Sequence, residues 1–307
     1  MKRSLMALMI PLAMILLTGC DATELGRRAI IQAAAVNYAD GEYTVSALMF
    51  SSGGGSGEID ASDENVIKVT GSGPTFAAAL DDISLTDGKD IFFSENKLLI
   101  IGGGFSENEL TPALEVMTRE LRCSLGMLVC SSDDPELLTD LHFTEGITSA
   151  EKPVSMIENA YRSGNSPKTC LLDLMNGTAA GKTVLIPQFA YTENGYGMTS
   201  DENGATAVLC GSREFSAGRL GRRFDMTETA GAMLLSGETD RVQLSFSHGG
   251  KEVGCEAYNV RIKRLEDGDI SISANLRRRN GETLPEELKN AAMEELHYLI
   301  SAAVDAK

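Results

Sequence analysis

Cys20 is the residue whose position points most directly to chemistry. It follows Leu17, Thr18 and Gly19, and an apolar residue, two small residues and a Cys form the pattern of a bacterial lipobox. The small residues give a signal peptidase access to the bond before Cys20, and the Cys20 thiol is the nucleophile that accepts a diacylglycerol. Covalent lipid chains hold a protein to a membrane without a spanning helix. The sequence therefore predicts lipid attachment at Cys20.

The segment before Cys20 has the features of an export signal. Lys2 and Arg3 form a basic start, and residues 5–17 form an apolar run of about 13 residues, shorter than the ~20 that span a bilayer. We expect residues 1–19 to be a lipoprotein signal peptide. An ordinary secretory signal with an incidental Cys, or a small transmembrane anchor, is the alternative. No later segment approaches 18 consecutive apolar residues, so we expect an externally exposed protein held by lipid.

The other cysteines are odd in number: Cys123, Cys130, Cys170, Cys210 and Cys255. An odd set cannot pair completely within one chain. Some lie in apolar contexts, where a free thiol behaves as a small hydrophobic side chain. No C-x-x-C pair occurs, which excludes a zinc ribbon and a thioredoxin motif. We interpret these cysteines as structural, and a disulfide between two of them stays open.

Two glycine-containing motifs resemble phosphate-binding loops but depart from their patterns. Residues 181–183 read Gly-Lys-Thr, yet a Walker loop requires Gly at position 176, which is Asn176. Residues 102–104 are three glycines after an apolar strand, but a dinucleotide fingerprint would need Gly at position 107, which is Glu107. We expect residues 102–104 to form a tight turn between a strand and a helix.

No arrangement of side chains typical of catalysis is visible. The three histidines are far apart in sequence, and neither H-E-x-x-H nor G-x-S-x-G occurs. Residues 81–82 and 133–134 are pairs of Asp, each beside an expected helix end, which indicates solvated helix capping. We therefore predict no catalytic residue, no metal site and no cofactor.

Two short basic runs have more than one interpretation. Residues 277–279 are three Arg between a strand and a turn, where a solvated loop is favoured over contact with anionic lipid or a partner. Arg27 and Arg28 follow the expected anchor closely enough to touch lipid headgroups.

Composition limits the remaining classes of function. The chain has 307 residues, 27 Lys plus Arg, and 44 Asp plus Glu, which gives a net charge of −17. So acidic a chain repels phosphate backbones, and nucleic-acid binding is excluded. Hydrophobic residues make up 43% and charged residues 23%, as in ordinary globular proteins.

The first half of the chain is expected to mix strands and helices. The Asp40-Gly41 turn predicts a β-hairpin over residues 28–50. Further strands are expected at 66–70, 97–101 and 125–131, and helices at 74–83 and 106–122. Residues 97–131 then form a βαβ unit.

The remaining elements are helical at first and then mostly strands. Helices are expected to start at 134–135, at Ser155 with Glu158 as a capping box, and at 166–167, the last ending at 176–177. The expected strands are 183–191, 205–210, 232–235, 241–247, 256–265 and 270–276, and a long helix follows at 283–303. We predict an α+β fold with mixed sheets and packed helices. Its expected parts are an N-terminal domain, residues 20–190, and a hairpin-rich part, residues 191–307, that ends in the long helix.

The order of these pieces resembles the Ger(x)C family, the lipoprotein C subunits of bacterial spore germinant receptors. Cys20 is followed by Asp-Ala-Thr-Glu-Leu and the hairpin, then by GSGPTFAAALDDIS, the strand KLLIIGGG and a helix with Arg119-Glu120. Later, ATAVLCGSREFSAGRL and ETAGAMLLSGE are similar to family segments. The likeness runs from Gly19 to about Glu238. Departures are the absence of Trp beside Cys20, the loss of a His near Glu95, and a shortened C-terminal domain.

The resemblance implies a non-enzymatic subunit of a membrane complex that triggers germination when nutrients bind. It also implies two membrane-embedded partners, the A and B type subunits, and a lipid-anchored location on the outer face of the cytoplasmic, or inner spore, membrane. The main alternative is a solute-binding lipoprotein of a transport system, but residues 205–280 read as hairpins rather than repeated βα units. A cell-envelope hydrolase is a third class, and it lacks a nucleophile–base set or a metal site.

Overall fold

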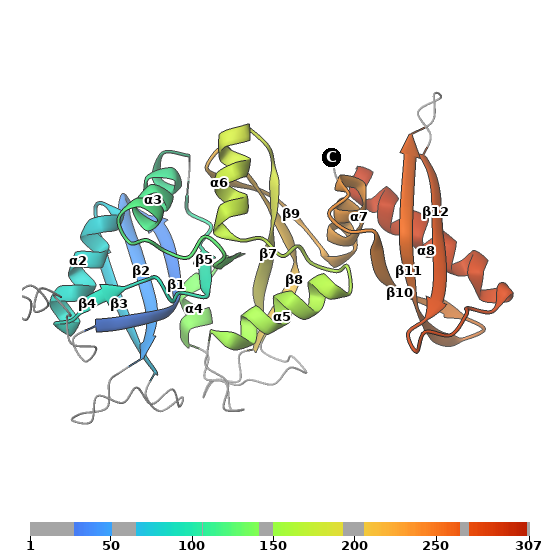
Figure 1. Cartoon of the computed structure of the whole chain (residues 1–307), viewed down its shortest axis with the longest axis horizontal. Helices are drawn as coiled ribbons and strands as arrows, with labels where there is room; N and C mark the ends of the chain where they lie inside the picture. The colour runs from blue at the N-terminus through green and yellow to red at the C-terminus, as the bar shows by residue number, and fades with distance from the viewer. Residues whose placement is uncertain are drawn as a thin grey trace, which may run out of the picture.

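The computed structural model describes residues 28–50, 66–105, 107–140, 150–192, 206–264 and 270–305 (Figure 1). The expected signal peptide and Cys20 lie outside these residues. Within the described part of the chain, no helix combines the length and apolarity required to cross a bilayer. The content is mixed α and β, with a long final helix, so the predicted α+β class is confirmed.

Most strands of the described residues belong to one mixed sheet, and the rest form a small antiparallel sheet. The order in the large sheet is β3-β2-β1-β5-β6-β7-β8-β9, with β4 beside β1. Its strands are β1 (Arg28–Ala39), β2 (Glu42–Phe50), β3 (Val66–Gly73), β4 (Asp90–Phe92), β5 (Leu98–Ile101), β6 (Leu128–Ser132), β7 (Val184–Thr192), β8 (Thr206–Ser216) and β9 (Arg219–Phe224).

The predicted hairpin is confirmed in β1 and β2. Asp40 and Gly41 have φ values of 53° and 87°, the geometry of a type I′ turn, whose twist matches that of paired strands. The register pairs Ala39 with Glu42 and Val36 with Val45. The turn therefore fixes which side chains of β1 face each side of the sheet.

The predicted βαβ unit is also confirmed. β5 and β6 are parallel, with Ile100 opposite Cys130, and α3 (Glu107–Arg119) connects them. β5 pairs on its other edge with β1, again in parallel. Its residues are all buried, as is typical of a central parallel strand covered on both faces.

Helices cover both faces of this sheet (Figure 1). One apolar cluster contains Phe76 of α2 (Phe76–Asp87), Leu110 of α3 and Leu174 of α6 (Leu171–Ala180). The cluster on the other face contains Ile157 of α5 (Glu151–Arg162) and Leu98 of β5. The short α4 (Pro135–Asp140) contacts β1, β2 and β5. The core is therefore a helix–sheet–helix sandwich.

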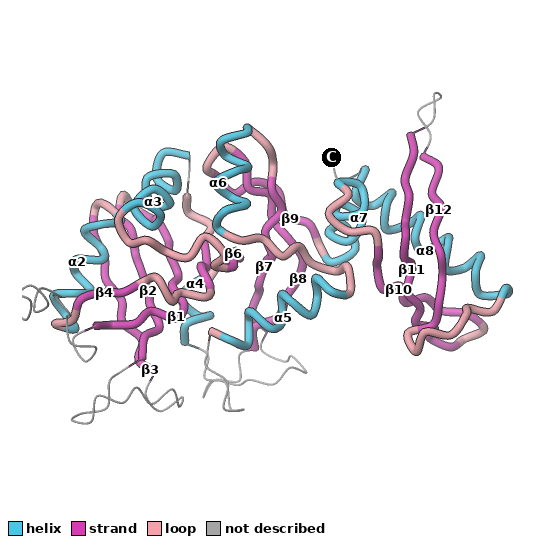
Figure 2. The backbone as a smooth tube through the Cα atoms, viewed as in Figure 1, coloured by secondary structure: helices cyan, strands magenta, loops and turns pink. Residues whose placement is uncertain are grey.

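The small sheet and two helices form a second unit at the other end of the molecule (Figure 2). Its sheet has the order β10-β11-β12, and α8 packs on one face of it. The bounds are α7 (Met226–Ser236), β10 (Arg241–His248), β11 (Lys251–Arg264), β12 (Ile270–Arg278) and α8 (Glu286–Asp305). The predicted stripe on α8 is buried: Leu288, Ala292, Leu296, Leu299 and Ala303.

The expected domain boundary after residue 190 falls near the end of β7. β7 and β8 pair across it from Val184–Phe215 to Thr192–Thr206, so the large sheet continues beyond that point. The change of architecture comes later, between β9 and α7. The division at residue 190 stays a prediction.

Three expected elements are wrong, each because a local signal was misassigned. Ser155 lies inside α5 rather than at its start. The helix expected from 166–167 begins at Leu171, and Gly177 is buried within it, because the left-handed C-cap is Gly181.

The expected strand 232–235 lies inside α7. This helix starts with a capping box in which Asp225 accepts a hydrogen bond from the Glu228 amide at 2.8 Å, and Glu228 accepts one from the Asp225 amide. The D-x-x-E pattern was the missed signal. The strands β4 and β9 were not predicted, and α8 begins at Glu286 rather than Thr283.

We predict that Gly231→Ala destabilises the protein, although alanine normally stabilises a helix interior by up to ~1 kcal/mol. A Cβ at Gly231 would lie 2.1 Å from the Leu299 carbonyl oxygen, where α7 crosses α8. We expect a loss of ~2 kcal/mol in the free energy of unfolding, measured by urea denaturation. Gly126→Ala is the control, because the nearest atom is 3.7 Å from its Cβ position. Equal effects of the two substitutions would contradict the close helix crossing.

Candidate functional site

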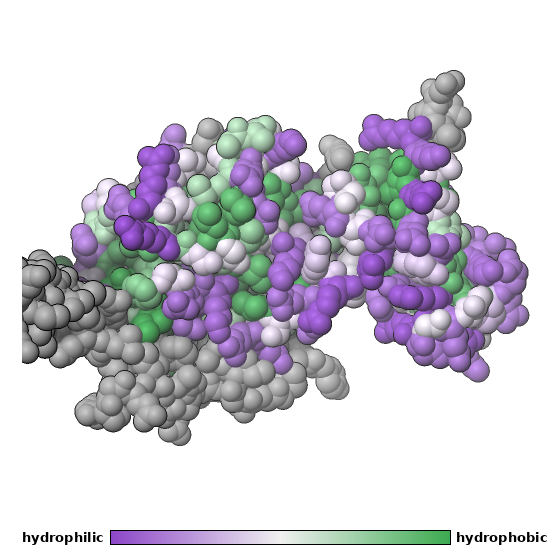
Figure 3. All heavy atoms as spheres, in the orientation of Figure 1, coloured by the Kyte–Doolittle hydropathy of each residue, from purple (hydrophilic) through white to green (hydrophobic). Residues whose placement is uncertain are grey.

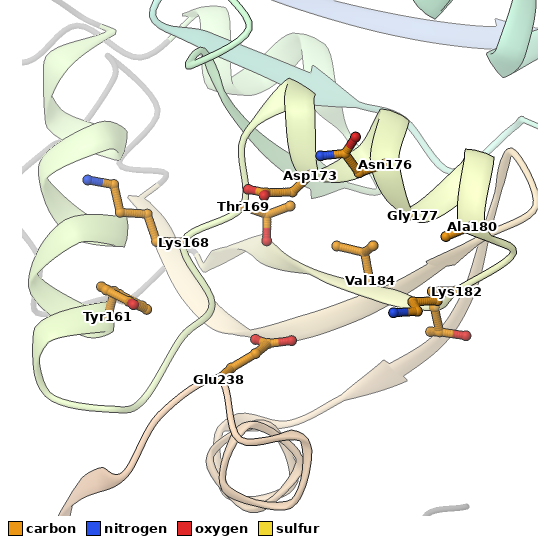
Figure 4. A pocket seen from close by; sticks show the side chains of 11 residues that line it. Tyr161, Lys168, Thr169, Asp173, Asn176, Gly177, Ala180, Lys182, Val184 and Glu238 are labelled. Carbon is orange, nitrogen blue, oxygen red and sulfur yellow. The ribbon is translucent and has the colours of Figure 1, made fainter.

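A cavity of about 420 Å³ lies where the large sheet meets the second unit (Figure 4). Its walls come from the end of α5, the segment leading into α6, α6 itself, the start of β7 and the residue after the C-cap of α7. The polar side chains that line it are Tyr161, Lys168, Thr169, Asp173, Asn176, Lys182, Thr183 and Glu238. The cavity is therefore built from both parts of the fold.

Helix capping places the α6 side of this cavity. Asp173 occupies the third position of α6 and accepts a hydrogen bond from the Cys170 amide at 2.9 Å. The helix ends at Gly181, so Lys182 begins the extended segment into β7. Gly177 lets the helix lie against this segment, since a Cβ there would be 2.3 Å from Cγ2 of Val184. The Gly-Lys-Thr motif is thus a helix end and not a phosphate loop.

Acidic and basic side chains line the cavity, and only some of them form ion pairs. Lys168 donates to Glu158 at 2.7 Å, which lowers the pKa of Glu158. Asp173 and Glu238 line the cavity from opposite walls (Figure 4). Burial, and then the charge of Asp173, raise the pKa of Glu238 above 4.5. Within the described residues, Lys182 forms no ion pair. The cavity suits a small polar molecule.

The described residues that line the cavity include no Ser, Cys or His. Cys170 lies beside it, but burial and the hydrogen bond to Asp173 raise the pKa of its thiol, which keeps it protonated. Among the described residues, no cluster of His, Cys, Asp and Glu could hold a metal ion. Among the described residues of the cavity, no Ser–His or Cys–His pair is therefore present.

A second group of charges lies at the carboxyl ends of β5 and β6. Asp133 accepts a hydrogen bond from Arg223 of β9, and its carboxylate is 3.7 Å from Nη1 of Arg213 of β8. Arg213 also donates to the Gly221 carbonyl at 3.1 Å. Asp133 was expected to be a solvated cap, and this expectation is wrong because it links the loop after β6 to the far strands of the sheet.

The other Asp pair also has a more specific contact than expected. Asp82 of α2 accepts a hydrogen bond from the Ser72 amide at 3.0 Å, which ties the helix to β3. The glycines 102–104 form the expected tight turn. A Cβ at Gly104 would lie 1.8 Å from the Tyr38 carbonyl oxygen, so only glycine allows this approach to β1.

The cysteines within the described residues are all free thiols. Cys123, Cys130 and Cys255 are buried, and burial raises the pKa of Cys123 to about 12 and that of Cys255 to about 11. Thiols this basic are protonated at neutral pH and poorly reactive. No disulfide joins the described cysteines, which agrees with their interpretation as structural. Cys20 lies outside the described residues, and lipid attachment there stays a prediction.

We predict that Glu238→Gln stabilises the protein in a pH-dependent way. The raised pKa of Glu238 means that its protonated form is favoured in the fold, so wild type loses stability as pH rises from about 4.5 through that pKa. The stability difference between variant and wild type is expected to be near zero at pH 4. It should grow to at most ~1 kcal/mol at pH 7.5, because the side chain is partly exposed to solvent. Denaturation at several pH values measures this difference, with Glu115→Gln on the exposed face of α3 as control. A difference that does not change with pH would contradict the Asp173–Glu238 repulsion.

We predict that Asp133→Asn destabilises the protein by ~1–3 kcal/mol, because it leaves the largely buried guanidinium of Arg213 without its counter-charge. The neighbouring Asp134→Asn is the matched control and is expected to change the free energy of unfolding by less than ~0.5 kcal/mol. Thermal or urea unfolding of both variants provides the comparison. Equal stability of the two would show that the Asp133 contacts contribute nothing.

Comparison with known proteins identifies the family of the chain. Residues 21–191 match the family model described as "Spore germination protein N-terminal domain", which is more than half of the chain. No curated protein sequence matches significantly. A solved structure titled "Crystal Structure of the GerBC protein" is 14% identical, with a TM-score of 0.47, over 89% of this chain and 80% of that one, and no argument rests on so distant a likeness. The match over residues 21–191 confirms the resemblance noted in the sequence, and the chain belongs to the Ger(x)C family of spore germination proteins.

Proposed function

We propose that this protein is the lipid-anchored, non-catalytic subunit of a membrane receptor complex that triggers spore germination in response to nutrients. The observation that carries the proposal is the family match over residues 21–191. The match begins at residue 21, and the mature chain would begin one residue earlier, at Cys20, if the lipobox is used. The family match and the expected anchor are therefore adjacent in the sequence.

The anchor explains how a chain of this kind stays at a membrane. Cys20 would carry a diacylglycerol, and more than one acyl chain is needed for stable attachment. Cys20 is followed after eight residues by Arg28, the first residue of β1. A fully extended segment of that length spans at most about 28 Å, so the large sheet would lie close to the bilayer surface.

The proposed partners are membrane-embedded A and B type subunits, and the proposed location is the outer face of the cytoplasmic membrane, which is the inner membrane of the spore. Germinant receptors of this family act as complexes, which is the basis for this part of the proposal. The glycine motifs that resemble nucleotide-binding loops have structural roles, as Gly181 at the end of α6 illustrates. The metal-binding motifs sought in the sequence are incomplete. We therefore assign no reaction to the chain.

A solute-binding lipoprotein is the second candidate, and the polar cavity is the observation in its favour. Such proteins usually consist of two similar α/β lobes. Here the two parts differ, because one has a large mixed sheet and the other a small antiparallel sheet covered by α8. The architecture favours the receptor subunit.

We predict that deleting the gene in its spore-forming source slows dipicolinate release from purified spores given nutrients. Wild-type complementation is expected to restore release, and Cys20→Ala to restore it weakly, because the unlipidated chain would leave the membrane. Thr23→Ala, just beyond the lipobox, is the matched control and is expected to behave as wild type.

Three results would contradict this function. Germination that stays normal with every nutrient after deletion of this gene and its paralogues would exclude the receptor role. Full rescue by Cys20→Ala would exclude the anchor while leaving the receptor role intact. A source organism that forms no spores would exclude the proposal altogether.

A further inference from the structure

One face of the β10-β11-β12 sheet has no covering element among the described residues. The apolar side chains of these strands point to the opposite face, where they pack with α8: Val242, Leu244, Phe246, Cys255 and Ala257. The residues that alternate with them point to the free face and are polar or charged: Ser245, Ser247, Glu252, Glu256, Tyr258, Arg261, Lys263, Ser271, Ser273, Asn275 and Arg277. Figure 3 shows hydrophilic side chains along this hairpin.

The outer half of β11 and β12 brings cations and hydroxyls together. Arg261 pairs in register with Ser273, and Lys263 with Ser271, and all four residues are exposed. Within the described part of the chain, neither Arg261 nor Lys263 has an ion-pair partner. Ammonium and guanidinium groups beside hydroxyls are donors that match phosphate oxygens.

Arg277 lies on the same face and is held in place by Glu256, which balances its charge. Its Nε donates to Glu256 at 2.7 Å, and its guanidinium carbon lies 4.8 Å from the centre of the Tyr258 ring. A side chain fixed in this way loses little entropy when it binds a partner. Residues 277–279 are thus strand and turn residues at the base of this face, and not the purely solvated loop that the sequence favoured.

The outer half of this face is basic among its described residues, although the whole chain is acidic. The chain has a net charge of −17, yet Arg261 and Lys263 are exposed on the outer half of the free face, whereas Arg264 and Arg278 alternate to the other side of the sheet. Acidic residues lie on both sides of the sheet. Glu252 and Glu256 are on the free face away from its outer half, and Glu256 is paired with Arg277. The acidic residues of α8 are on the other side: Glu286, Glu287, Glu294 and Glu295. Helix and sheet layers are ~10 Å apart, about one Debye length at physiological salt, so the acidic residues of α8 act less strongly than the nearer cations on a surface that contacts the sheet.

We propose that the free face of the β10-β11-β12 sheet docks on an anionic phospholipid surface. Charge complementarity carries this inference, because cations and hydroxyls converge on an uncovered face of an otherwise acidic protein. The proximity of a membrane rests on the lipid anchor of the proposed function, whereas the charge argument does not. With both contacts the molecule would lie along the membrane, held by lipid at one end and by this face at the other.

The test uses the chain from residue 21, which lacks the signal peptide and Cys20 with its lipid, so that any vesicle binding is independent of the anchor. Flotation with phosphatidylcholine vesicles and with vesicles containing 30% phosphatidylglycerol is measured at low and physiological salt. Binding is expected only to the anionic vesicles and is expected to weaken with salt. Each basic residue near an anionic surface contributes roughly a fivefold factor in affinity, so the double variant Arg261→Gln/Lys263→Gln should bind about 25-fold more weakly.

The matched control is Arg119→Gln/Arg219→Gln, which removes two exposed cations from α3 and β9 and is expected to leave binding unchanged. Thermal unfolding confirms that both variants are folded. The proposal is overturned if anionic vesicles are not bound, if both vesicle types are bound equally, or if the two double variants lose the same affinity. A DNA duplex bound tightly in the absence of vesicle binding would also overturn it. None of these outcomes depends on whether the gene affects germination.

Discussion

The pairing of β1 on both of its edges is the constraint on which the large sheet depends. This strand is antiparallel to β2 along one edge and parallel to β4 and β5 along the other, so every later strand is placed with reference to it. Its centre is Ala33-Ala34-Ala35, buried on alternate faces, and such small side chains allow both helical layers to approach closely. A slip of one residue in β1 would exchange the two faces and disrupt both apolar clusters.

The large sheet and the second unit are joined where β10 contacts the end of α5. The Gln243 amide of β10 donates to the Ser163 carbonyl at the end of α5 at 3.0 Å, and Gly164 allows that approach because a Cβ there would lie 2.0 Å from the Arg241 carbonyl oxygen. The polar cavity opens beside this joint, with Glu238 contributed from one side and Asp173 from the other. Any molecule that binds there, or any protonation of Glu238, therefore acts where the two parts of the chain meet.

The elements that the sequence predicted correctly are those with local signals. The Asp40-Gly41 turn, the glycine turn after β5 and the apolar stripe of α8 each depend on a few neighbouring residues. The failures have physical causes of two kinds. The apolar run at 232–235 fits a strand or a helix equally well, and β9 is mostly polar because it lies at the edge of the sheet. The Asp133–Arg223 contact joins residues that are 90 positions apart in the sequence. The residues that line the cavity are spread between positions 161 and 238. Neither feature could be recognised from a local sequence pattern.

A β-bulge in β11 decides which way the outer part of its hairpin faces. Tyr258 pairs with Asn275 and Arg261 with Ser273, so two residues of β11 lie opposite one of β12, and Asn259 at φ 51° takes up the extra length. The bulge exchanges the faces of the sheet to which the following residues of β11 point. Without that single residue, Val260 and Ile262 would face water, and Arg261 and Lys263 would face α8. The insertion or deletion of one residue at this position therefore decides whether charged or apolar side chains cover the outer part of this face. A relative of this protein that has one residue fewer here would present an apolar surface.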